Sequence, residues 1–234
     1  MAEKSTPPVI AIDGPGGSGK GTVSSLLSRR LGFHLLDSGA FYRLTALAAR
    51  DAGVSLENPA AVADLAAGLE ARFVAGGENE PARVFLEGRD VDDALRSESC
   101  GNDASVVATF PQVRKALIGR QRAFRRPPGL VADGRDMGTV VFPDAAVKIF
   151  LTASPEERAR RRHKQLIAKG INGNLPALVR EIEARDERDR NRAVAPLKPA
   201  DDAVVIDTSG HDIDAVLNRV LDIVTSSGLK VPRR

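Results

Sequence analysis

The chain has 234 residues, of which 42% are hydrophobic and 28% charged, and its formal net charge is +3 at pH 7. This composition suffices for a buried core, excludes a largely disordered chain and favours one domain with insertions over two independent domains. Its one cysteine, Cys100, can form neither an intramolecular disulfide nor a metal site by itself. No stretch is apolar over the roughly 18 residues that a membrane-spanning helix needs, and Val9–Ile12 is too short for a signal peptide. We therefore expect a cytoplasmic protein with no membrane partner.

Short apolar runs alternate with helix-length amphipathic segments, which is typical of a parallel sheet with helices on both faces. The predicted strands are Val9–Asp13, Phe33–Leu36, Leu130–Asp133, Val147–Leu151 and Ala203–Asp207. The predicted helices are Lys20–Leu31, Ala40–Ala52, Pro59–Leu69, Pro111–Arg125, Pro155–Lys169, Leu175–Arg190 and Ile213–Thr225. The pattern indicates an α/β fold.

A long insertion, residues 39–109, separates the second and third predicted strands of the sheet. It contains a candidate hairpin, formed by Ala71–Val74 and Arg83–Leu86 around a turn at Ala75–Asn79. An antiparallel segment inside a parallel fold predicts a separate subdomain. We expect a single domain over residues 1–228 that contains this insertion, followed by a basic tail at 229–234.

A glycine-rich segment with one lysine follows the first predicted strand and opens the first predicted helix. Glycines let the backbone turn sharply, so that its N–H groups and the helix N-terminus can surround a phosphate, which Lys20 then reaches. The segment matches G-x-x-x-x-G-K, but Gly21 stands where Ser or Thr is usual. The alternative is a glycine turn without a ligand. We predict that the following residues bind ATP: Gly14, Pro15, Gly16, Gly17, Ser18, Gly19, Lys20, Gly21 and Thr22.

Asp133 ends the third predicted strand of the sheet, where an enzyme with such a loop holds its Mg²⁺. Asp13 and Asp207 end strands in the same way and compete for the assignment. We expect Asp133 and Thr22 on the metal side, with Mg²⁺ bound mostly through phosphates and water.

Three polar segments, Leu35–Arg43, Asp133–Gly138 and Arg185–Arg192, have the character of an acceptor site. The first two follow strands, and the carboxyl ends of parallel strands are where ligands bind. The third continues an apolar helical stripe that begins at Leu175 and reaches Ile182, so charges replace apolar side chains on the buried face. A solvated helix face is the usual explanation of a charge run, but this one faces the core and indicates a polar ligand.

Arginines gather between Arg158 and Arg162, in the helix predicted from Pro155. They either serve a short lid at 155–173, with glycines at 170 and 173 as hinges, or pair with Glu156 and Glu157 on a solvated face. The histidines His34, His163 and His211 have no metal-like or triad neighbours and are predicted to be structural.

Together these segments resemble the bacterial cytidylate kinases along nearly the whole chain. The resemblance covers the Gly-Lys-Gly-Thr loop, Asp-Ser-Gly-Ala-Phe-Tyr-Arg from Asp37, Ala-Asp-Gly-Arg-Asp-Met-Gly from Ala132 and Arg-Asp-Arg-Asn-Arg-Ala-Val-Ala-Pro-Leu from Arg188. It implies a P-loop kinase core with an inserted monophosphate-binding subdomain and a short lid. The implied reaction transfers the γ-phosphoryl group of ATP to CMP or dCMP, with Mg²⁺ and as a monomer.

The same resemblance implies roles for individual residues. The catalytic set is Lys20, Arg43, Arg135, Arg158 and Arg162. The set expected around CMP is Ser38, Tyr42, Arg43, Ser105, Arg114, Arg135, Asp136, Arg185, Asp189 and Arg192. Of these, Ser105 and Arg114 lie in the least distinctive surroundings, where a core serine or a surface arginine is the alternative.

The chemistry of cytosine is consistent with this set. A carboxylate such as Asp136 can accept from the exocyclic amine of cytosine, whereas uracil would present a carbonyl there. The alternatives are a kinase for UMP or another monophosphate, a P-loop GTPase and a nucleic-acid-binding module. No Asn-Lys-x-Asp guanine motif occurs, and an aromatic content of 4% leaves few platforms for stacked bases. We therefore expect nucleotide substrates and no nucleic-acid partner.

Overall fold

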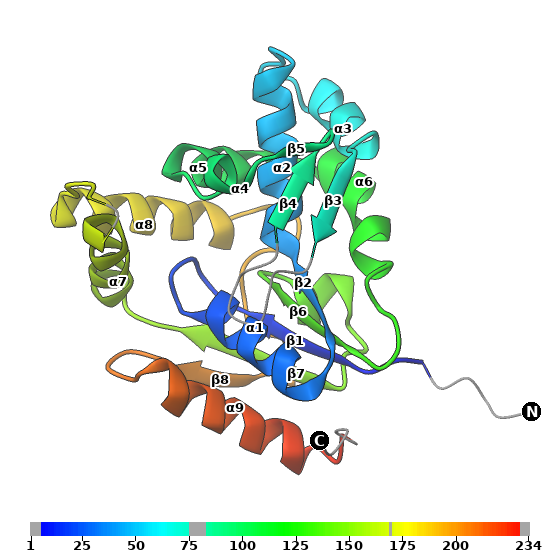
Figure 1. The fold of residues 1–234 in the computed structure, drawn as a ribbon, viewed down its shortest axis with the longest axis vertical. Coiled ribbons are helices and arrows are strands. Elements are labelled where there is room, and N and C mark those ends of the chain that lie inside the picture. The colour runs from blue at the N-terminus through cyan, green and yellow to red at the C-terminus, as the bar shows by residue number, and fades with distance from the viewer. Residues whose placement is uncertain (1–5, 75–82, 169, 230–234) are drawn as a thin grey trace, which may run out of the picture. The chain divides into compact units, whose positions relative to one another are not determined.

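The structure is a computed structural model that describes residues 6–74, 83–168 and 170–229 (Figure 1). The chain divides into two compact units, and each has its own sheet. The first unit runs to Asp37 and resumes at Gln121; the second is Ser38–Arg120. Within the described ranges, no helix is long and apolar enough to cross a bilayer.

The first unit is built on a parallel sheet of five strands in the order β2-β6-β1-β7-β8. The strands are β1 (Val9–Asp13), β2 (His34–Asp37), β6 (Leu130–Gly134), β7 (Val147–Thr152) and β8 (Val204–Asp207). Every residue of the two central strands β1 and β6 is buried, as the unbroken apolar runs predict for strands covered on both faces. Ile12 pairs with Asp133 and Asp13 with Gly134, so the two aspartates lie close together near the ends of neighbouring strands.

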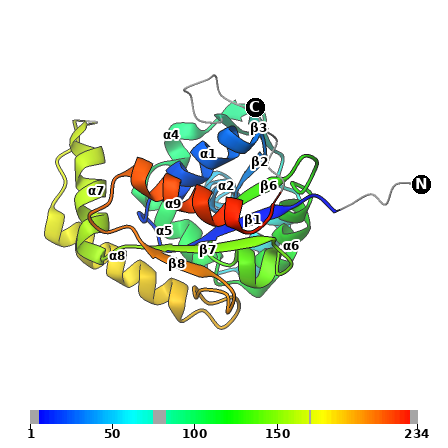
Figure 2. The ribbon, with the colours of Figure 1, turned by 90° about the horizontal axis from the view of Figure 1, so that it is seen from below.

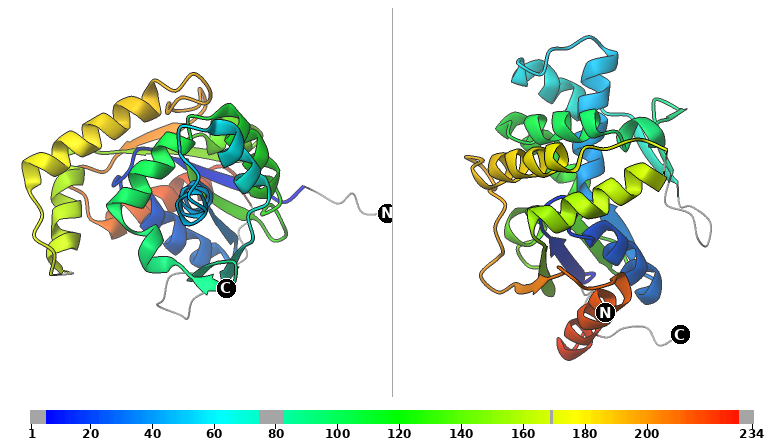
Figure 3. Two further views of the ribbon diagram at one scale, coloured as in Figure 1. Left: turned by 90° about the horizontal axis from the view of Figure 1, so that it is seen from above. Right: turned by 90° about the vertical axis from the view of Figure 1, so that its left-hand side faces the viewer.

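Helices α1 (Lys20–Leu31) and α9 (Ile213–Ser226) lie side by side on one face of this sheet (Figure 2). Their apolar side chains join those of β1, β6, β7 and β8 in one hydrophobic core. Helices α7 (Pro155–Ala168) and α8 (Leu175–Arg190) pack against each other (Figure 3). The predicted α/β class is confirmed.

The second unit packs its longest helix, α2 (Ser38–Asp51), against α3 (Pro59–Ala67), α4 (Asp92–Leu95) and α5 (Glu98–Val107). Its sheet is antiparallel, with strands β3 (Ala71–Val74), β4 (Arg83–Leu86) and β5 (Arg89–Asp90). The two strands of the predicted hairpin are confirmed, while its turn at Ala75–Asn79 lies outside the described residues.

The second unit contains the residues 39–109 expected for the insertion and also the start of α6 (Pro111–Arg122). Arg120 on α6 donates to the carbonyl oxygens of Ala67 and Leu69, which fastens the helix there. The basic tail expected at 229–234 falls outside the described residues except for Leu229.

Two predicted boundaries are wrong for identifiable reasons. The second strand begins at His34 rather than Phe33, because Phe33 N–H donates to Ser28 O and closes the end of α1. Helix α6 ends at Arg122 rather than Arg125, because the N–H groups of Phe124 and Arg125 bond three residues back in tighter turns.

Candidate active site

The loop between β1 and α1 has a backbone that only glycine adopts readily. Gly14, Gly17 and Gly19 have positive φ, with values of 151°, 79° and 89°. A side chain at Gly14 would also place its Cβ 2.0 Å from the carbonyl oxygen of Leu151 on β7. The loop therefore follows the path that its glycines allow, with the N-terminus of α1 at Lys20.

Lys20 folds back over this loop. Its Nζ donates to Pro15 O at 3.1 Å and lies 3.9 Å from Asp133 Oδ1. Burial, together with the nearby charge of Arg135, lowers the pKa of Lys20 to about 8, although Asp133 acts in the opposite direction. A buried cation with a lowered pKa at a phosphate loop is the electrostatic pattern of a functional site.

Two arginines approach the loop at Gly16. A Cβ placed on Gly16 would lie 3.4 Å from Arg135 Nη2 and 3.8 Å from Arg185 Nη1. Asp189 holds Arg135 in place, since Arg135 Nε donates to Asp189 Oδ2 at 3.0 Å. Although burial acts in the opposite direction, the positive charges of Arg135, Arg185 and Arg192 hold the pKa of Asp189 below its usual value. The arrangement places cationic groups where an anion on the loop would need them.

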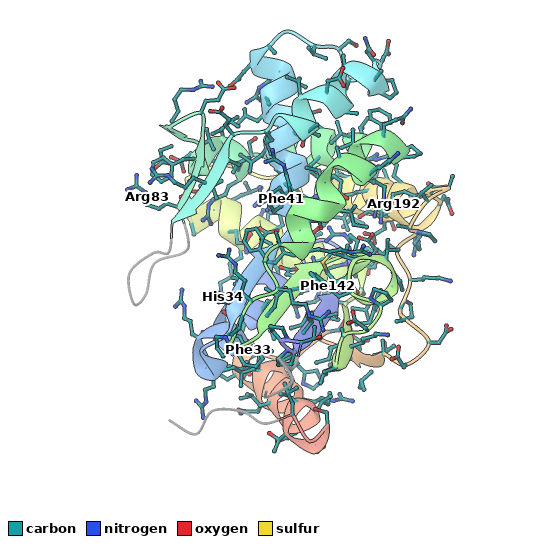
Figure 4. The ribbon with its side chains drawn as sticks, turned by 90° about the vertical axis from the view of Figure 1, so that its right-hand side faces the viewer. Phe33, His34, Phe41, Arg83, Phe142 and Arg192 are labelled. Atoms are coloured by element: carbon teal, nitrogen blue, oxygen red, sulfur yellow. The ribbon has the colours of Figure 1, made fainter. Side chains whose placement is uncertain are left out.

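The buried face of α8 changes from apolar to charged, as its sequence predicts. Leu178, Asp186 and Asp189 are its buried residues. Beyond the helix, Arg192 (labelled in Figure 4) is also buried, and its Nη2 donates to Ala195 O at 2.6 Å. Charges in such a position require partners, and carboxylates and arginines supply them for each other.

Arg158 on α7 is buried, and its guanidinium has three different partners. It forms a bidentate pair with Asp186 of α8, at 3.0 Å from Nη1 and 2.5 Å from Nη2. It also donates to Gly16 O at 3.1 Å and to Ala153 O at 3.0 Å. Arg158 therefore supports the loop through a carbonyl group, and Asp186 is a partner that the sequence analysis did not single out.

The other arginines of α7 follow the ion-pair alternative more closely. Arg160 and Arg161 both pair with Glu157, and Arg161 also donates to Thr208. Arg162 Nη1 lies 3.5 Å from Gln165 Oε1. Their participation in a lid over residues 155–173 stays a prediction.

The three aspartates that the sequence places at strand ends have different surroundings in the parallel sheet, where Asp37 also ends a strand, β2. Asp133 lies beside Lys20, whereas Asp207 is exposed and accepts from Ser209 N–H at 2.8 Å. Asp13 is buried and accepts from the N–H groups of Met137 and Gly138 at 2.7 and 2.8 Å. Burial raises the pKa of Asp13 to about 7, although these two bonds act in the opposite direction. Asp133 is the one whose carboxylate faces the loop.

The described residues contain no cluster of three or more His, Cys, Asp or Glu side chains that could hold a metal ion. The Asp133 carboxylate beside Lys20, with Thr22 in the first turn of α1, fits Mg²⁺ that is bound mainly by phosphate and water oxygens. The residues present therefore fit the metal that the resemblance implies, in that mode of binding.

The second unit carries the other residues that were predicted to bind the acceptor. Ser38 and Ser105 are each 3% exposed, at the start of α2 and on α5. Arg114 on α6 lies over the Tyr42 ring, 5.8 Å from its centroid, and donates to Ala108 O at 3.4 Å. Arg43 is partly buried on α2. This unit thus brings Tyr42 and Arg114 together.

The side chain of His34, which was predicted to be structural, has a hydrogen-bond partner in the structure (Figure 4). Its Nε2 lies 2.9 Å from Pro127 O, close to the start of β6. Such a bond to a backbone carbonyl oxygen anchors the strand β2 at its beginning and needs no ligand.

A glycine loop ahead of a helix, a buried lysine and arginines that converge on that loop define a P-loop nucleotide kinase. The sequence profile of the cytidylate kinase family matches residues 10–226. The chain belongs to that family. It is an ATP-dependent phosphotransferase that acts on a nucleoside monophosphate.

Curated relatives agree with the profile. The cytidylate kinase of Pseudomonas aeruginosa is 60% identical over 214 residues, which cover 92% of this chain and 93% of that protein. The cytidylate kinase of Pseudomonas paraeruginosa is 58% identical over 224 residues, 96% of this chain and 98% of that one. That of a Shewanella species is 57% identical over 224 residues, 96% of both chains.

Proposed function

We propose that the protein transfers the γ-phosphoryl group of ATP to CMP or dCMP, giving ADP and CDP or dCDP. The observation that carries the proposal is the position of Asp136. This carboxylate is 2% exposed and directly follows Arg135, whose guanidinium approaches the phosphate loop at Gly16. A base-recognising group and a phosphate-binding group thus occupy adjacent positions at the end of β6.

Asp136 selects the base. Its carboxylate accepts from the exocyclic amine of cytosine, whereas the carbonyl group of uracil would leave two acceptors facing each other. The family membership likewise favours CMP over UMP. It gives no support to a GTPase or to a nucleic-acid-binding module.

The transfer needs no general base. The second pKa of a phosphate monoester is about 6, so the acceptor is largely a dianion at neutral pH and its oxygen can attack the γ-phosphorus in line. Lys20, Arg135 and the N–H groups of the loop hold the phosphates and neutralise their charge. Mg²⁺ supplies further charge neutralisation when it is bound, and Asp133 and Thr22 are the residues that would hold it.

The remaining predictions belong to the same proposal. Ser38, Tyr42, Arg43, Ser105 and Arg114 of the second unit contribute to CMP binding. Arg185, Asp189 and Arg192 of the first unit also contribute to CMP binding. The ion pair between Arg135 Nε and Asp189 Oδ2, at 3.0 Å, supports a further role of Asp189 in orienting Arg135. Residues 155–173 act as the lid, and the protein works as a monomer in the cytoplasm.

The direct test is ADP formation from ATP and Mg²⁺ with CMP, dCMP, UMP and AMP as acceptors. We expect CMP and dCMP to give the highest kcat/KM. Turnover with CMP and dCMP no greater than in reactions without an acceptor would contradict the proposal.

The variant Asp136→Ala tests the selection of the base. We expect kcat/KM with CMP to fall by about 10²-fold, because a specific contact to a base contributes roughly 1–3 kcal/mol and its loss also misplaces the acceptor. The loss with UMP should be much smaller. Asp201→Ala, at an exposed aspartate of the same unit, is the matched control and should leave both values unchanged.

A further inference from the structure

Asp13 immediately precedes the phosphate loop but contributes nothing to its motif. Both oxygens of its carboxylate accept backbone hydrogen bonds, Oδ1 from Met137 N–H and Oδ2 from Gly138 N–H. These are the first two N–H groups after Asp136. The side chain of Asp13 thus spans from the end of β1 to the turn that follows β6.

The turn that Asp13 holds is a π-helix, Met137–Val141, which begins immediately after Asp136. The carbonyl oxygen of Asp136 accepts from Val140 N–H at 2.9 Å and from Val141 N–H at 3.1 Å. The first N–H groups of any helix have no acceptor within it, and short π-helices form where outside contacts support them. Asp13 supplies acceptors for two of these N–H groups, so the backbone that follows Asp136 is held by bonds to Asp13 and to the carbonyl oxygen of Asp136.

The surroundings of the turn leave it little room to move. A Cβ on Gly134 would lie 2.8 Å from Cγ and Cε of Met137, which is itself fully buried. A Cβ on Gly138 would lie 3.1 Å from Lys148 Cδ and 3.5 Å from Asp13 Oδ2. Packing and hydrogen bonds therefore select one position of the turn.

Burying the carboxylate of Asp13 to make this contact is energetically unfavourable. Asp13 is 5% exposed, and the structure gives its side chain no cation partner among the described residues. Burial and the like charges of Asp136 and Asp133 disfavour its ionised form and raise its pKa. A group kept in so unfavourable an environment beside a substrate site points to a role in function rather than in stability.

We propose that Asp13 is a positioning residue, whose carboxylate holds the 136–138 turn and thereby directs the Asp136 side chain at the base of the acceptor. This inference rests on the proposed function for its consequence, the selection of cytosine. The hydrogen bonds themselves can be tested without any substrate.

The experiment compares the protein with its Asp13→Asn variant. An amide has one acceptor oxygen and a donor NH₂ group, so it can satisfy only one of the two N–H groups and repels the other. We expect the amide hydrogens of Met137 and Gly138 to exchange at least about tenfold faster in the variant, because local opening is no longer opposed by both bonds. Unchanged exchange at both amides would overturn the proposal, whatever the substrate is.

The kinetic measurement tests the consequence. A displacement of a substrate by about 1 Å can lower the rate roughly 10²-fold. We therefore expect kcat/KM with CMP to fall by about 10- to 100-fold. The ratio of kcat/KM with CMP to kcat/KM with UMP should become smaller. The KM of ATP should stay within about twofold, because the loop glycines and Lys20 are intact. An unchanged CMP to UMP ratio, or equal losses for ATP and CMP, would overturn the positioning role.

Two further variants serve as controls for the Asp13→Asn experiment. Asp207→Asn changes another aspartate that ends a strand and accepts a backbone N–H, so it should alter neither exchange at 137 and 138 nor the CMP to UMP ratio. Asp13→Ala removes both acceptor oxygens without adding a donor, and it decides the question if Asp13→Asn does not fold. It should shift the ratio in the same direction, and an unchanged ratio would count against the proposal. If the unaltered protein does not prefer CMP, the proposed function fails, while the exchange measurement still judges the hydrogen bonds.

Discussion

The phosphate loop and the α7–α8 helix pair lie in the first unit, and they differ in how they are built around charged groups. The loop is built largely from glycines, and at Gly14 there is no room for a side chain, since a Cβ there would lie 2.0 Å from Leu151 O. The helix pair buries whole side chains and satisfies them with one another, as Arg158 and Asp186 do. A site made of backbone is specified by a few glycines in sequence, whereas a site made of ion pairs is specified by the packing of distant segments.

The largest effect on activity is expected from the loss of the Lys20 side chain at the start of α1. Lys20→Ala should lower kcat by about 10³-fold, because one preorganised donor to a developing charge is worth roughly that much. Steady-state rates with CMP would show it, with Lys198→Ala, an exposed lysine of the same unit, as the control. Near-normal turnover would mean that the backbone alone performs the function of the loop.

The backbone character of the loop can be tested by stability. Gly14→Ala combines a positive φ with the close approach to Leu151 O, so it should lower the free energy of unfolding by more than about 3 kcal/mol. Gly210 also has a positive φ, but a Cβ there would have no atom within 4 Å. Gly210→Ala should therefore lower the free energy of unfolding by only about 1 kcal/mol. Denaturant titration of both variants measures the difference. Equal costs would show that the clash at Gly14 is relieved elsewhere.

The side-chain character of the helix pair is tested by Arg158→Lys. Lysine keeps the charge but cannot pair with Asp186 through two parallel bonds, so we expect a loss of about 2 kcal/mol in the free energy of unfolding. Arg160→Lys on the same helix affects an exposed pair with Glu157 and should change it by less than about 0.5 kcal/mol. If the two substitutions cost the same, burial of the Arg158–Asp186 pair has no energetic consequence.

The smallest effect concerns pH. Because burial and Arg135 lower the pKa of Lys20 to about 8, the free protein loses the proton of Lys20 as the pH rises through that value. We expect kcat/KM for ATP to decline above pH 8, while kcat stays flatter because bound phosphates favour the protonated lysine. In Lys20→Arg the decline should vanish, since arginine does not lose its proton in this range. A decline that persists in that variant would assign it to another group.

The contrast between the two regions also explains what could be predicted from the sequence. The strands β1 and β6 were predicted from unbroken apolar runs, and α1 from the glycine–lysine motif, because these signals are local. Helix α5 was missed, since Gly101 and Asn102 lower its helix propensity and packing against α2 compensates. The two-residue strand β5 and the π-helix after Asp136 have no sequence pattern of their own.

The site residues divide in the same way. Lys20 and the loop glycines follow from spacing, whereas the role of Asp136 was inferred from the resemblance to the cytidylate kinases. The partnership of Asp186 with Arg158 depends on how α7 packs on α8, which no periodicity within either helix reveals. Asp13 was recognised only as one of three aspartates at predicted strand ends, because the two N–H groups that donate to its carboxylate lie 124 and 125 positions away in the sequence.

The hydrogen bond from Arg158 to Gly16 O has a consequence for protein engineering. One guanidinium connects α7, α8 and the loop, so each of these segments depends on the other two for its contacts. A chimera that takes α8 from a protein without an aspartate at position 186 would leave a buried positive charge with the carbonyl oxygens of Gly16 and Ala153 as its remaining partners. Residues 16, 158 and 186 are therefore best exchanged together.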